Sequence, residues 1–395
     1  IMNKNILFTS YHCYLDWSNG ASITVREILH ALTQFGWNVN ILSGAGLDSP
    51  DNIDQIIADQ SFDKVTKLEP SADSSFSLRI FIDKGMRSTI FCPIKQSPIP
   101  SKTDGDHFLQ LLQETVMNTC PKILLTYGGY HLGPTTLRLT KNAGVQTVVI
   151  LQNLAYNNAV YFADADAVIV PSYFAQKHYA DKLGIQSVVI PPLLSVDTPN
   201  MSKDFSKRRY LTYINPEQGK GMTWFAKIAR ILNDKRPNIE ILVVEGRGKI
   251  SRFAQTGQIL SGVRNLHVMP NTPNPADFLQ VSKIVLMPSY YEETFGRVAA
   301  EAMLNGIPVI VSNRGALPEV VGSAGFVLAI PDHFQPDSLE IPSDTEVEEW
   351  IDAIIQLWYN FDYYNLVCQK CLEFSTRWRW ETVASQYASF FLGMI

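Results

Sequence analysis

The feature that most constrains this chain is the alternation of short apolar runs with amphipathic stretches along most of its length. The run Asn5–Thr9 is followed, after a loop, by helical spacing over Ala21–Phe35 and by a second apolar run at Trp37–Leu42. Short buried strands that alternate with helices are typical of βαβ units built around a parallel sheet. The sequence therefore predicts an α/β protein with Rossmann-like, doubly wound sheets.

The same pattern predicts further strands and helices, whereas Asp48–Pro100 is rich in Ser, Asp and Pro with weak periodicity and is expected to be a variable region. Strands are predicted at Ile123–Thr126, Thr147–Leu151, Ala167–Val170, Ser187–Pro192, Tyr210–Ile214, Ile239–Val244, Leu266–Met269, Lys283–Met287 and Pro308–Ser312. Helices are predicted at Gly221–Asn233, Val298–Asn305 and Trp378–Phe391.

Chain length and one polar stretch indicate two domains. The chain has 395 residues, which is more than one hydrophobic core usually organises. The polar run Ser195–Arg209 follows a strand that ends in two prolines, and a second strand–helix series begins after it. We predict a first domain at 1–195, completed by a C-terminal crossing helix at 376–395, and a second at 196–375, facing each other across a central cleft.

Composition excludes several classes of protein. The formal net charge of −5 and pI near 5.8 leave no basic footprint for nucleic acid. The five cysteines are odd in number and scattered, which argues against a disulfide framework. No run of about twenty apolar residues exists to span a membrane, and the first apolar run is too short for a signal peptide. We expect a cytoplasmic protein with no nucleic-acid partner.

The segment 290–311 carries the most chemical information. It follows a predicted strand and opens a helix at about Gly296, where free backbone amides form an anion site. Glu301 lies among apolar neighbours, and burying an unpaired carboxylate would cost several kcal/mol, so it needs a partner such as a ribose diol. Glu293, just before the helix, is placed to accept from sugar hydroxyls. The alternative is that one glutamate caps the helix and the other forms an ion pair in the core.

The neighbourhood of these glutamates favours the first interpretation. Glu293 and Glu301 are separated by seven residues and followed by the run at 306–322, a pattern that resembles the donor-binding signature of glycosyltransferase family 4. The resemblance continues through 165–172 and 219–221, covering the second half densely and the first half in fragments. It implies a retaining, sugar-nucleotide-dependent glycosyltransferase with the GT-B fold.

The resemblance also implies roles for individual residues. Glu301 matches the glutamate that holds the nucleotide ribose, Glu293 the one that binds the donor sugar, and Lys220 the lysine on the diphosphate. Main-chain contacts beside the sugar are implied for Thr294, Phe295 and Gly296. Contacts to the base in this fold are largely main-chain and are expected around Asn271.

One cation of the family pattern is missing. The family usually carries an arginine shortly before the lysine, but Ile214 and Asn215 stand in that region here. Arg247, which follows the next strand, is our candidate replacement; alternatively it is a surface loop arginine. Lys220, Arg247 and the helix-start amides would stabilise the negative charge that develops on the departing diphosphate. We expect this to replace a metal.

In the first domain the resemblance is weaker. Gly20 corresponds to the glycine loop that approaches the donor phosphate, or is simply a turn glycine. Gln152 and Asn153 stand where many family members carry a histidine, and an amide can hydrogen-bond a sugar hydroxyl but cannot act as a base. His12 and His131 could line the acceptor side or serve the structure.

The motif Asp164-Ala-Asp166 resembles a metal-binding D-x-D. We reject that interpretation, because the motif lies in a polar turn before a strand where this family also carries Ala-Asp-Ala. The expected protein therefore uses no metal and no cofactor beyond its nucleotide-sugar co-substrate.

The predicted reaction is transfer of a hexose, with retention, to a hydroxyl of a polysaccharide or lipid-linked glycan. UDP-glucose is the expected donor from its frequency in the family and not from any residue. The acceptor would lie at the inner face of the membrane, with peripheral membrane contact. The alternatives are an epimerase or phosphorylase of the same fold, and a non-catalytic two-domain sugar-binding protein.

Overall fold

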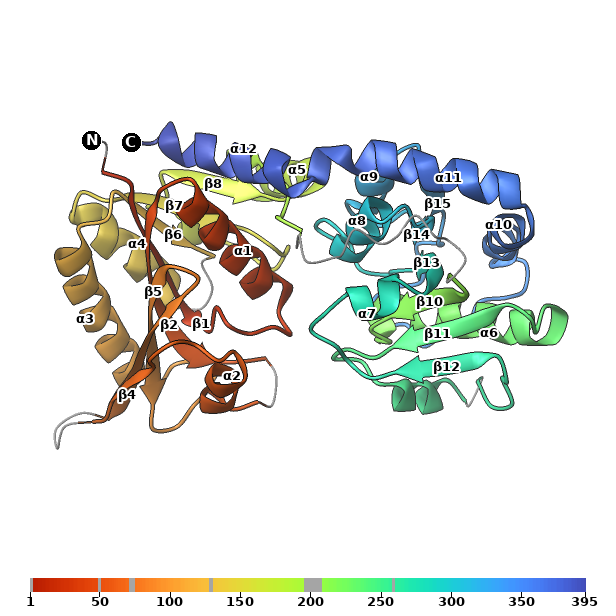
Figure 1. The fold of residues 1–395 in the computed structure, drawn as a ribbon, viewed down its shortest axis with the longest axis horizontal. Coiled ribbons are helices and arrows are strands. Elements are labelled where there is room, and N and C mark those ends of the chain that lie inside the picture. Colours follow the sequence, from red (N-terminus) through yellow and green to blue (C-terminus); the bar gives the residue numbers. More distant parts are fainter. Residues whose placement is uncertain (1–2, 49–50, 71–74, 128–130, 195–207, 258–259) are drawn as a thin grey trace. The chain divides into compact units, whose positions relative to one another are not determined.

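The chain folds into two compact units, which the computed structural model in Figure 1 describes for most of the sequence. The first unit comprises Ile1–Leu193 and Glu381–Ile395, and the second comprises Leu194–Trp380. The described residues are 3–48, 51–70, 75–127, 131–194, 208–257 and 260–395.

The first unit is built on one twisted sheet. Its elements are β1 (Asn5–His12), α1 (Gly20–Gln34), β2 (Asn38–Gly46), α2 (Ile53–Asp59), β3 (Thr66–Leu68), β4 (Phe76–Asp83), β5 (Met86–Pro93), α3 (Lys102–Thr119), β6 (Ile123–Thr126), α4 (Leu132–Asn142), β7 (Gln146–Ile150), the 3₁₀ helix η1 (Ala159–Phe162), β8 (Ala167–Val170), α5 (Tyr173–Leu183), β9 (Val188–Val189) and the late helix α12 (Trp380–Leu392). The strands lie in the order β3-β4-β5-β2-β1-β6-β7-β8-β9. All neighbours from β5 to β9 are parallel.

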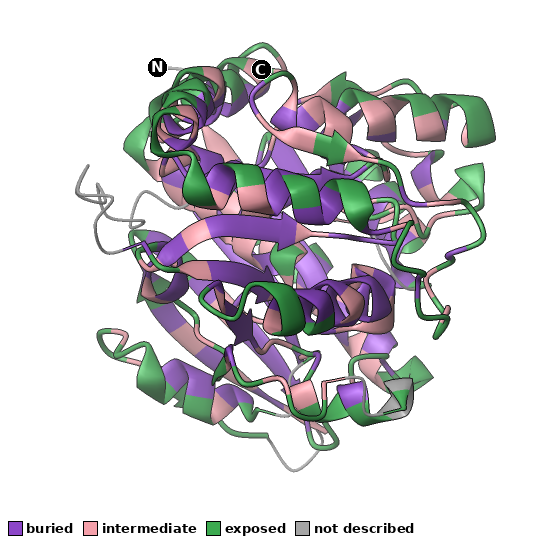
Figure 2. Ribbon diagram, turned by 90° about the vertical axis from the view of Figure 1, so that its right-hand side faces the viewer, coloured by how far each residue is buried: buried purple, intermediate pink, exposed green. Residues whose placement is uncertain are grey.

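The strands of this sheet form the core of the unit. Ile6, Leu7 and Phe8 of β1 are fully buried in succession, as expected for a parallel strand covered by helices on both faces. In Figure 2 most strands are coloured as buried, while the helices are buried along one side and exposed along the other. The predicted strands at Ile123–Thr126 and Ala167–Val170 are confirmed at their predicted bounds.

The region Asp48–Pro100 is more ordered than its sequence suggested. It contains α2 and an antiparallel hairpin of β4 and β5 that extends the sheet beyond β2. The hairpin turns at Lys84 and Gly85, whose φ angles of 47° and 86° are both positive. Such angles at both turn positions are typical of the type I′ turn that matches the twist of a hairpin.

The second unit has a smaller, wholly parallel sheet. Its elements are β10 (Tyr210–Ile214), η3 (Gln218–Lys220), α6 (Met222–Lys235), β11 (Glu240–Val244), η4 (Ile250–Thr256), β12 (Leu266–Met269), α7 (Ala276–Leu279), β13 (Ser282–Met287), α8 (Arg297–Leu304), β14 (Val309–Ser312), α9 (Leu317–Val321), β15 (Phe326–Leu328), α10 (Glu348–Tyr359), α11 (Phe361–Phe374) and η5 (Ser375–Trp378). The order β12-β11-β10-β13-β14-β15 is the Rossmann order, counted within this unit as 3-2-1-4-5-6. The predicted α/β class with two Rossmann-like domains is confirmed.

The structure gives other bounds than predicted for two segments, the linker between the units and the C-terminal helix. Positions 195–207 of the predicted linker lie outside the described residues, but Arg208 is buried in the second unit, where its guanidinium donates to the Gly306 carbonyl at 2.7 Å. The predicted C-terminal crossing helix at 376–395 begins only at Trp380, because the 3₁₀ turn η5 precedes it. The assignment of acceptor and donor roles to the two units stays a prediction.

The last helix belongs to the first unit, although it follows the second unit in sequence. The Tyr387 hydroxyl donates to the Pro191 carbonyl at 3.1 Å, and the rings of Phe391 and Trp37 meet edge to face with centroids 6.1 Å apart. Tyr387 and Phe391 are fully buried. The helix is therefore part of the core of the first unit.

Candidate active site

Two predicted site residues come from the loops at the switch point of the second sheet. In this sheet β10 lies between β11 and β13, so the strand order reverses between β10 and β13. Ligands of open α/β sheets bind outside the carboxyl ends of the strands at such a point. Lys220 follows β10 at the end of η3, and Glu293 follows β13, so both lie at this point.

The structure brings these two side chains into contact. Lys220 Nζ lies 2.5 Å from Glu293 Oε1, with side chains 27% and 14% exposed. The Ser289 hydroxyl donates to the same carboxylate oxygen at 3.0 Å, and the Ser312 hydroxyl holds the Ser289 carbonyl at 2.7 Å. Ser289 is a site residue that the sequence analysis missed, because a serine after a strand carries no distinctive signal.

The backbone of Glu293 is held by a glycine on the loop after β14. Gly315 has a φ of +60°, and a Cβ there would lie 2.3 Å from the Glu293 carbonyl oxygen. The next residue, Ala316, donates its amide to that carbonyl at 2.7 Å. The close approach is possible only because residue 315 has no side chain.

The helix after Glu293 begins where the sequence predicted. Gly296, with a φ of +96°, is the N-cap of α8, and the adjacent Phe295 is buried with its ring 5.8 Å from that of Trp378. Thr294 is half-buried. The positive end of the helix dipole therefore begins four residues after Glu293 in the sequence.

Glu301 is buried on α8, 6% exposed, as predicted. Burial raises the pKa of its carboxyl, and the nearby Arg297 charge offsets part of that rise. Arg297 Nη2 lies 3.3 Å from Glu301 Oε1, one turn earlier on the same helix. A core ion pair was one of the alternatives considered for this glutamate, and the structure contains that pair.

Arg247 lies on the loop after β11, which is tied to the loop after β10. Asn215, itself left-handed with a φ of 59°, accepts the Gly248 amide at 2.7 Å. Arg247 is 56% exposed, and its Nε lies 3.8 Å from Glu217 Oε1. Arg247 thus contacts the loop that carries Lys220, and its role as a replacement cation stays a prediction. Asn271, in the loop after β12, is exposed.

A cavity of about 390 Å³ lies within the first unit. Gln152 and Asn153, the predicted substitutes for the family histidine, line it together with His12. The complete lining is His12, Asn19, Ala21, Asp48, Tyr127, Gln152, Asn153, Ala155, Tyr156, Asn157 and Tyr161. These residues follow β1, β2, β6 and β7, so the cavity lies at the switch point between β1 and β6 of this sheet.

Two other residues predicted for the first domain do not line the cavity. Gly20 is the exposed first residue of α1, and a Cβ there would meet no atom within 4 Å. The part of the first unit that the structure describes therefore does not require a glycine at that position. His131 is exposed at the N-terminus of α4.

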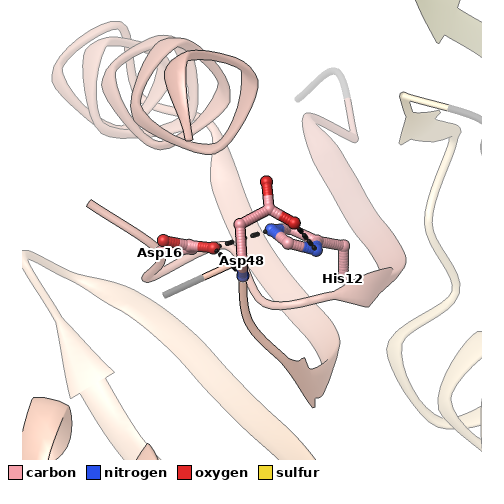
Figure 3. A group of neighbouring side chains, drawn as sticks. All are labelled: His12, Asp16 and Asp48. Atoms are coloured by element: carbon pink, nitrogen blue, oxygen red, sulfur yellow. Dashed lines mark hydrogen bonds and ion pairs between the residues drawn. The ribbon is translucent and has the colours of Figure 1, made fainter. Parts of the chain in front are cut away.

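Figure 3 shows a compact group of three side chains, His12, Asp16 and Asp48. His12 and Asp48 also line the cavity. Asp16 is completely buried, and its Oδ2 accepts from His12 Nε2 at 3.0 Å and from the Asp48 amide at 2.7 Å. Its Oδ1 accepts from the Ser18 amide at 3.0 Å and hydroxyl at 2.6 Å. Burial alone would raise the pKa of the Asp16 carboxyl, but these hydrogen bonds lower it overall. The sequence analysis missed both aspartates.

The rejected D-x-D motif has structural contacts. Asp166 Oδ2 accepts the Thr147 amide at 2.9 Å, and its Oδ1 lies 2.9 Å from Lys141 Nζ. Asp164 lies 3.3 Å from Arg138 Nε. The motif ties the loop before β8 to β7 and α4.

Two further observations bear on the setting of the site. Across the described residues, no helix has the length and hydrophobicity needed to cross a bilayer. All five cysteines are free thiols, and only Cys120 is exposed.

The arrangement of the two units matches a known fold. Two parallel-sheet units of this kind form the GT-B fold of glycosyltransferases, and solved structures of that fold match nearly the whole chain. Sucrose-phosphate synthase from Thermosynechococcus elongatus matches with a TM-score of 0.68 and 17% identity over 99% of each chain. Anabaena HepE in complex with UDP matches with a TM-score of 0.69 and 15% identity, over 99% of this chain and 100% of that one.

The second unit is similar in sequence to known glycosyltransferases. Residues 210–360, which lie within the second unit, match the family "Glycosyl transferases group 1". Lipopolysaccharide 1,2-N-acetylglucosaminetransferase of Salmonella typhimurium is 28% identical over 194 residues, covering 42% of this chain and 50% of the relative. O-antigen chain mannosyltransferase B of Escherichia coli is 26% identical over 196 residues, covering 48% and 51%. The chain thus spans about half the length of these curated relatives.

Proposed function

We propose that this protein transfers a sugar from a nucleoside diphosphate sugar, held by the second unit, to a hydroxyl of a glycan. The observation that carries the proposal is the 2.5 Å contact between Lys220 Nζ and Glu293 Oε1 at the switch point. The match of residues 210–360 to the group 1 family supports the same assignment. Family 4 membership and a retaining mechanism are compatible with this match and are part of the proposal.

The Lys220–Glu293 pair suits a site that waits for a charged donor. Without donor, each side chain neutralises the other in a partly buried place, where a lone charge would be costly. When a diphosphate enters, Lys220 can turn to it, and Glu293 is free to accept from hydroxyls of the transferred sugar. The Ser289 hydroxyl, 3.0 Å from Glu293 Oε1, keeps that carboxylate in place during the exchange.

Breaking the anomeric C–O bond leaves negative charge on the diphosphate. We assign Lys220, Arg247 and the N-terminus of α8 to that charge, because fixed positive groups stabilise it as it develops. Glu301 is assigned to the ribose: two ribose hydroxyls would donate to a buried carboxylate whose one ion-pair partner among the described residues is Arg297. In this proposal the reaction needs no metal and no separate cofactor.

The donor and the acceptor are the finer parts of the proposal. UDP-glucose is the first donor to test, and a polysaccharide or lipid-linked glycan the first acceptor. The names of the Salmonella and Escherichia relatives, which act on lipopolysaccharide and O-antigen, support that kind of acceptor for this chain. Contact with the inner face of a membrane follows from such an acceptor and is proposed with it.

The decisive test is a panel of UDP-, GDP-, ADP- and TDP-sugars, read as the rise in Tm and as slow release of free nucleoside diphosphate. One nucleotide should raise the Tm, because a ligand that binds only the native state stabilises it. Lys220→Ala should abolish most of that rise, whereas Lys177→Ala, which removes an exposed lysine of α5, should not. If no nucleotide shifts the Tm, the transferase assignment is wrong. Turnover of the sugar without release of nucleotide would indicate an epimerase.

A further inference from the structure

His12 is a buried histidine whose two ring nitrogens have different surroundings. Its side chain is 7% exposed, and Nε2 lies 3.0 Å from Asp16 Oδ2. Nδ1 has no hydrogen bond to any described residue and lies 3.9 Å from Asp48 Oδ1. The backbone of His12 is fixed as well, since its carbonyl accepts from the hydroxyls of Tyr127 and Ser43, each at 3.2 Å. The residue is thus held rigidly at the end of β1, beside the cavity.

The carboxylate of Asp16 determines which nitrogen carries the proton. The lowered pKa of Asp16 keeps it ionised at neutral pH, and an ionised carboxylate can only accept hydrogen bonds. Nε2 must therefore donate. In the neutral ring Nδ1 then presents its lone pair, next to the carboxylate of Asp48.

Asp48 is held in place by two contacts. Its amide donates to Asp16 at 2.7 Å, and its Oδ2 accepts from Asn19 Nδ2 at 2.6 Å. Asn19 is itself oriented by α1, because its Oδ1 caps the amides of Ala21 and Ser22. Asp48 Oδ1 has no hydrogen bond within the described residues. Two fixed acceptor atoms, His12 Nδ1 and Asp48 Oδ1, thus lie 3.9 Å apart beside the cavity, and no described residue donates a hydrogen bond to either.

A metal ion is a poorer occupant of this group than a pair of hydroxyls. His12, Asp16 and Asp48 are close enough to share an ion. However, both oxygens of Asp16 already accept two hydrogen bonds each, from His12, the Asp48 amide and Ser18. Only two ligand atoms would remain for the ion, whereas two O–H donors would satisfy both.

We propose that His12 and Asp48 bind two hydroxyl groups on neighbouring carbons of the acceptor sugar, with His12 Nδ1 accepting from one and Asp48 from the other. Asp16 is the positioning residue that holds the imidazole in the required tautomer. This inference rests on the proposed function, because it takes the cavity to be the acceptor side. Tyr127, Tyr156 and Gln152 add aromatic and amide side chains to the lining, which suits a sugar ring.

The test is to follow the imidazole nitrogens by NMR in the full-length, chelator-treated protein labelled with ¹⁵N-histidine. The His12 signals are assigned by their loss in His12→Gln. The probes are the methyl α-glycosides of glucose, galactose and mannose. We expect the Nε2–H tautomer before addition, and a saturable shift of the Nδ1 signal with at least one glycoside. Asp48→Asn should weaken that binding at least tenfold, because it removes a charged hydrogen-bond acceptor. Asp181→Asn, at an exposed position of α5, should leave it unchanged.

Asp16→Asn tests the positioning role. It should redistribute the His12 tautomers and weaken glycoside binding, while the rise in Tm with UDP, which depends on the second unit, remains. An unchanged tautomer ratio in this variant would show that Asp16 does not hold the ring.

Three results would overturn the subsite. These are no shift of His12 with any of the glycosides, equal binding by Asp48→Asn and the unmodified protein, or a shift that appears only when zinc is added. A rise in Tm with UDP, together with any of these, would refute the subsite and leave the proposed function standing. Glycoside binding without any nucleotide effect would refute the proposed function instead.

Discussion

The buried carboxylates of Asp16 and Glu301 show how differently the two units treat a charge in their interior. Asp16 receives four hydrogen bonds from its own unit, and its pKa is lowered despite complete burial. Glu301 has one arginine at 3.3 Å among alanines, and burial raises its pKa. A carboxylate whose hydrogen bonds are complete organises its surroundings. A buried carboxylate with few donors is stabilised most when a ligand supplies more, as proposed for Glu301 and the ribose.

The largest expected difference between Asp16 and Glu301 is in how much each contributes to the free energy of unfolding. Asp16→Ala leaves the buried His12 Nε2 and three partly buried donors without this partner and should lower the free energy of unfolding by about 3–5 kcal/mol. Glu301→Ala removes a carboxylate that is poorly satisfied and should cost under about 2 kcal/mol. Urea unfolding measures both, with Asp181→Ala as an exposed control expected within about 0.5 kcal/mol of the unmodified protein. Equal losses for Asp16 and Glu301 would remove the contrast.

The second unit holds Glu293 by its backbone, and Gly315→Ala tests that contact. Left-handed backbone costs an alanine about 1–2 kcal/mol, and the new Cβ would also collide with the Glu293 carbonyl. We expect the free energy of unfolding to fall by about 2–3 kcal/mol. We also expect the variant to lose most of its donor hydrolysis activity. Gly262→Ala is the matched control, since its φ is +77° with no atom within 4 Å of a Cβ. If both variants hydrolyse donor alike, the close packing against Glu293 is irrelevant.

For nucleotide binding, the substitution of Glu301 should have the larger effect and that of Asp16 the smaller. Glu301→Gln keeps the volume but loses a charged acceptor, so affinity for UDP should fall about tenfold, or about 1.4 kcal/mol. Asp16→Asn should leave that affinity unchanged. Titration calorimetry measures both, and Glu373→Gln, an exposed glutamate of α11, serves as the control. An intact affinity in Glu301→Gln would contradict its assignment to the ribose.

The smallest expected effect is on the pH dependence of the free energy of unfolding, to which Asp16 and Glu301 should contribute with opposite signs. The pKa of Asp16 is lowered from 3.8, so its stabilising contribution is present above that value and is lost as the pH falls through the folded pKa below it. The pKa of Glu301 is raised from 4.5, so its contribution is present below that value and is lost as the pH rises through the folded pKa above it. Unfolding free energies of Asp16→Asn and Glu301→Gln, measured from acid to neutral pH, should diverge from the unmodified protein in opposite directions. Divergence in the same direction would contradict one of the two shifts.

The fold of the second unit was largely predictable from sequence, because short local patterns mark the bounds of its strands and helices. The strands Tyr210–Ile214 and Leu266–Met269 have the predicted bounds, and α8 begins one residue after Gly296. The proximity of Lys220 and Glu293 could be predicted, because each residue follows a strand that flanks the switch point. Their roles in binding remain predictions.

The site in the first unit could be predicted only in part. Gln152, Asn153 and His12 were named, but Asp16 and Asp48 were not, because their hydrogen bond joins loops 32 residues apart. Their meeting depends on the parallel pairing of β1 with β2, including its irregularity between Ser10 and His12. The hairpin of β4 and β5 was missed because polar composition obscured the turn signal of Lys84 and Gly85.

The return of α12 to the first unit has a consequence for how the protein is made. Synthesis runs from the N-terminus, so residues up to Leu193 leave the ribosome long before the helix that covers Trp37 exists. The second unit, Leu194–Trp380, is continuous and has all its strands before that helix is translated. The half of the protein that begins first is thus finished last, and until then its unfinished core presents apolar surface to chaperones.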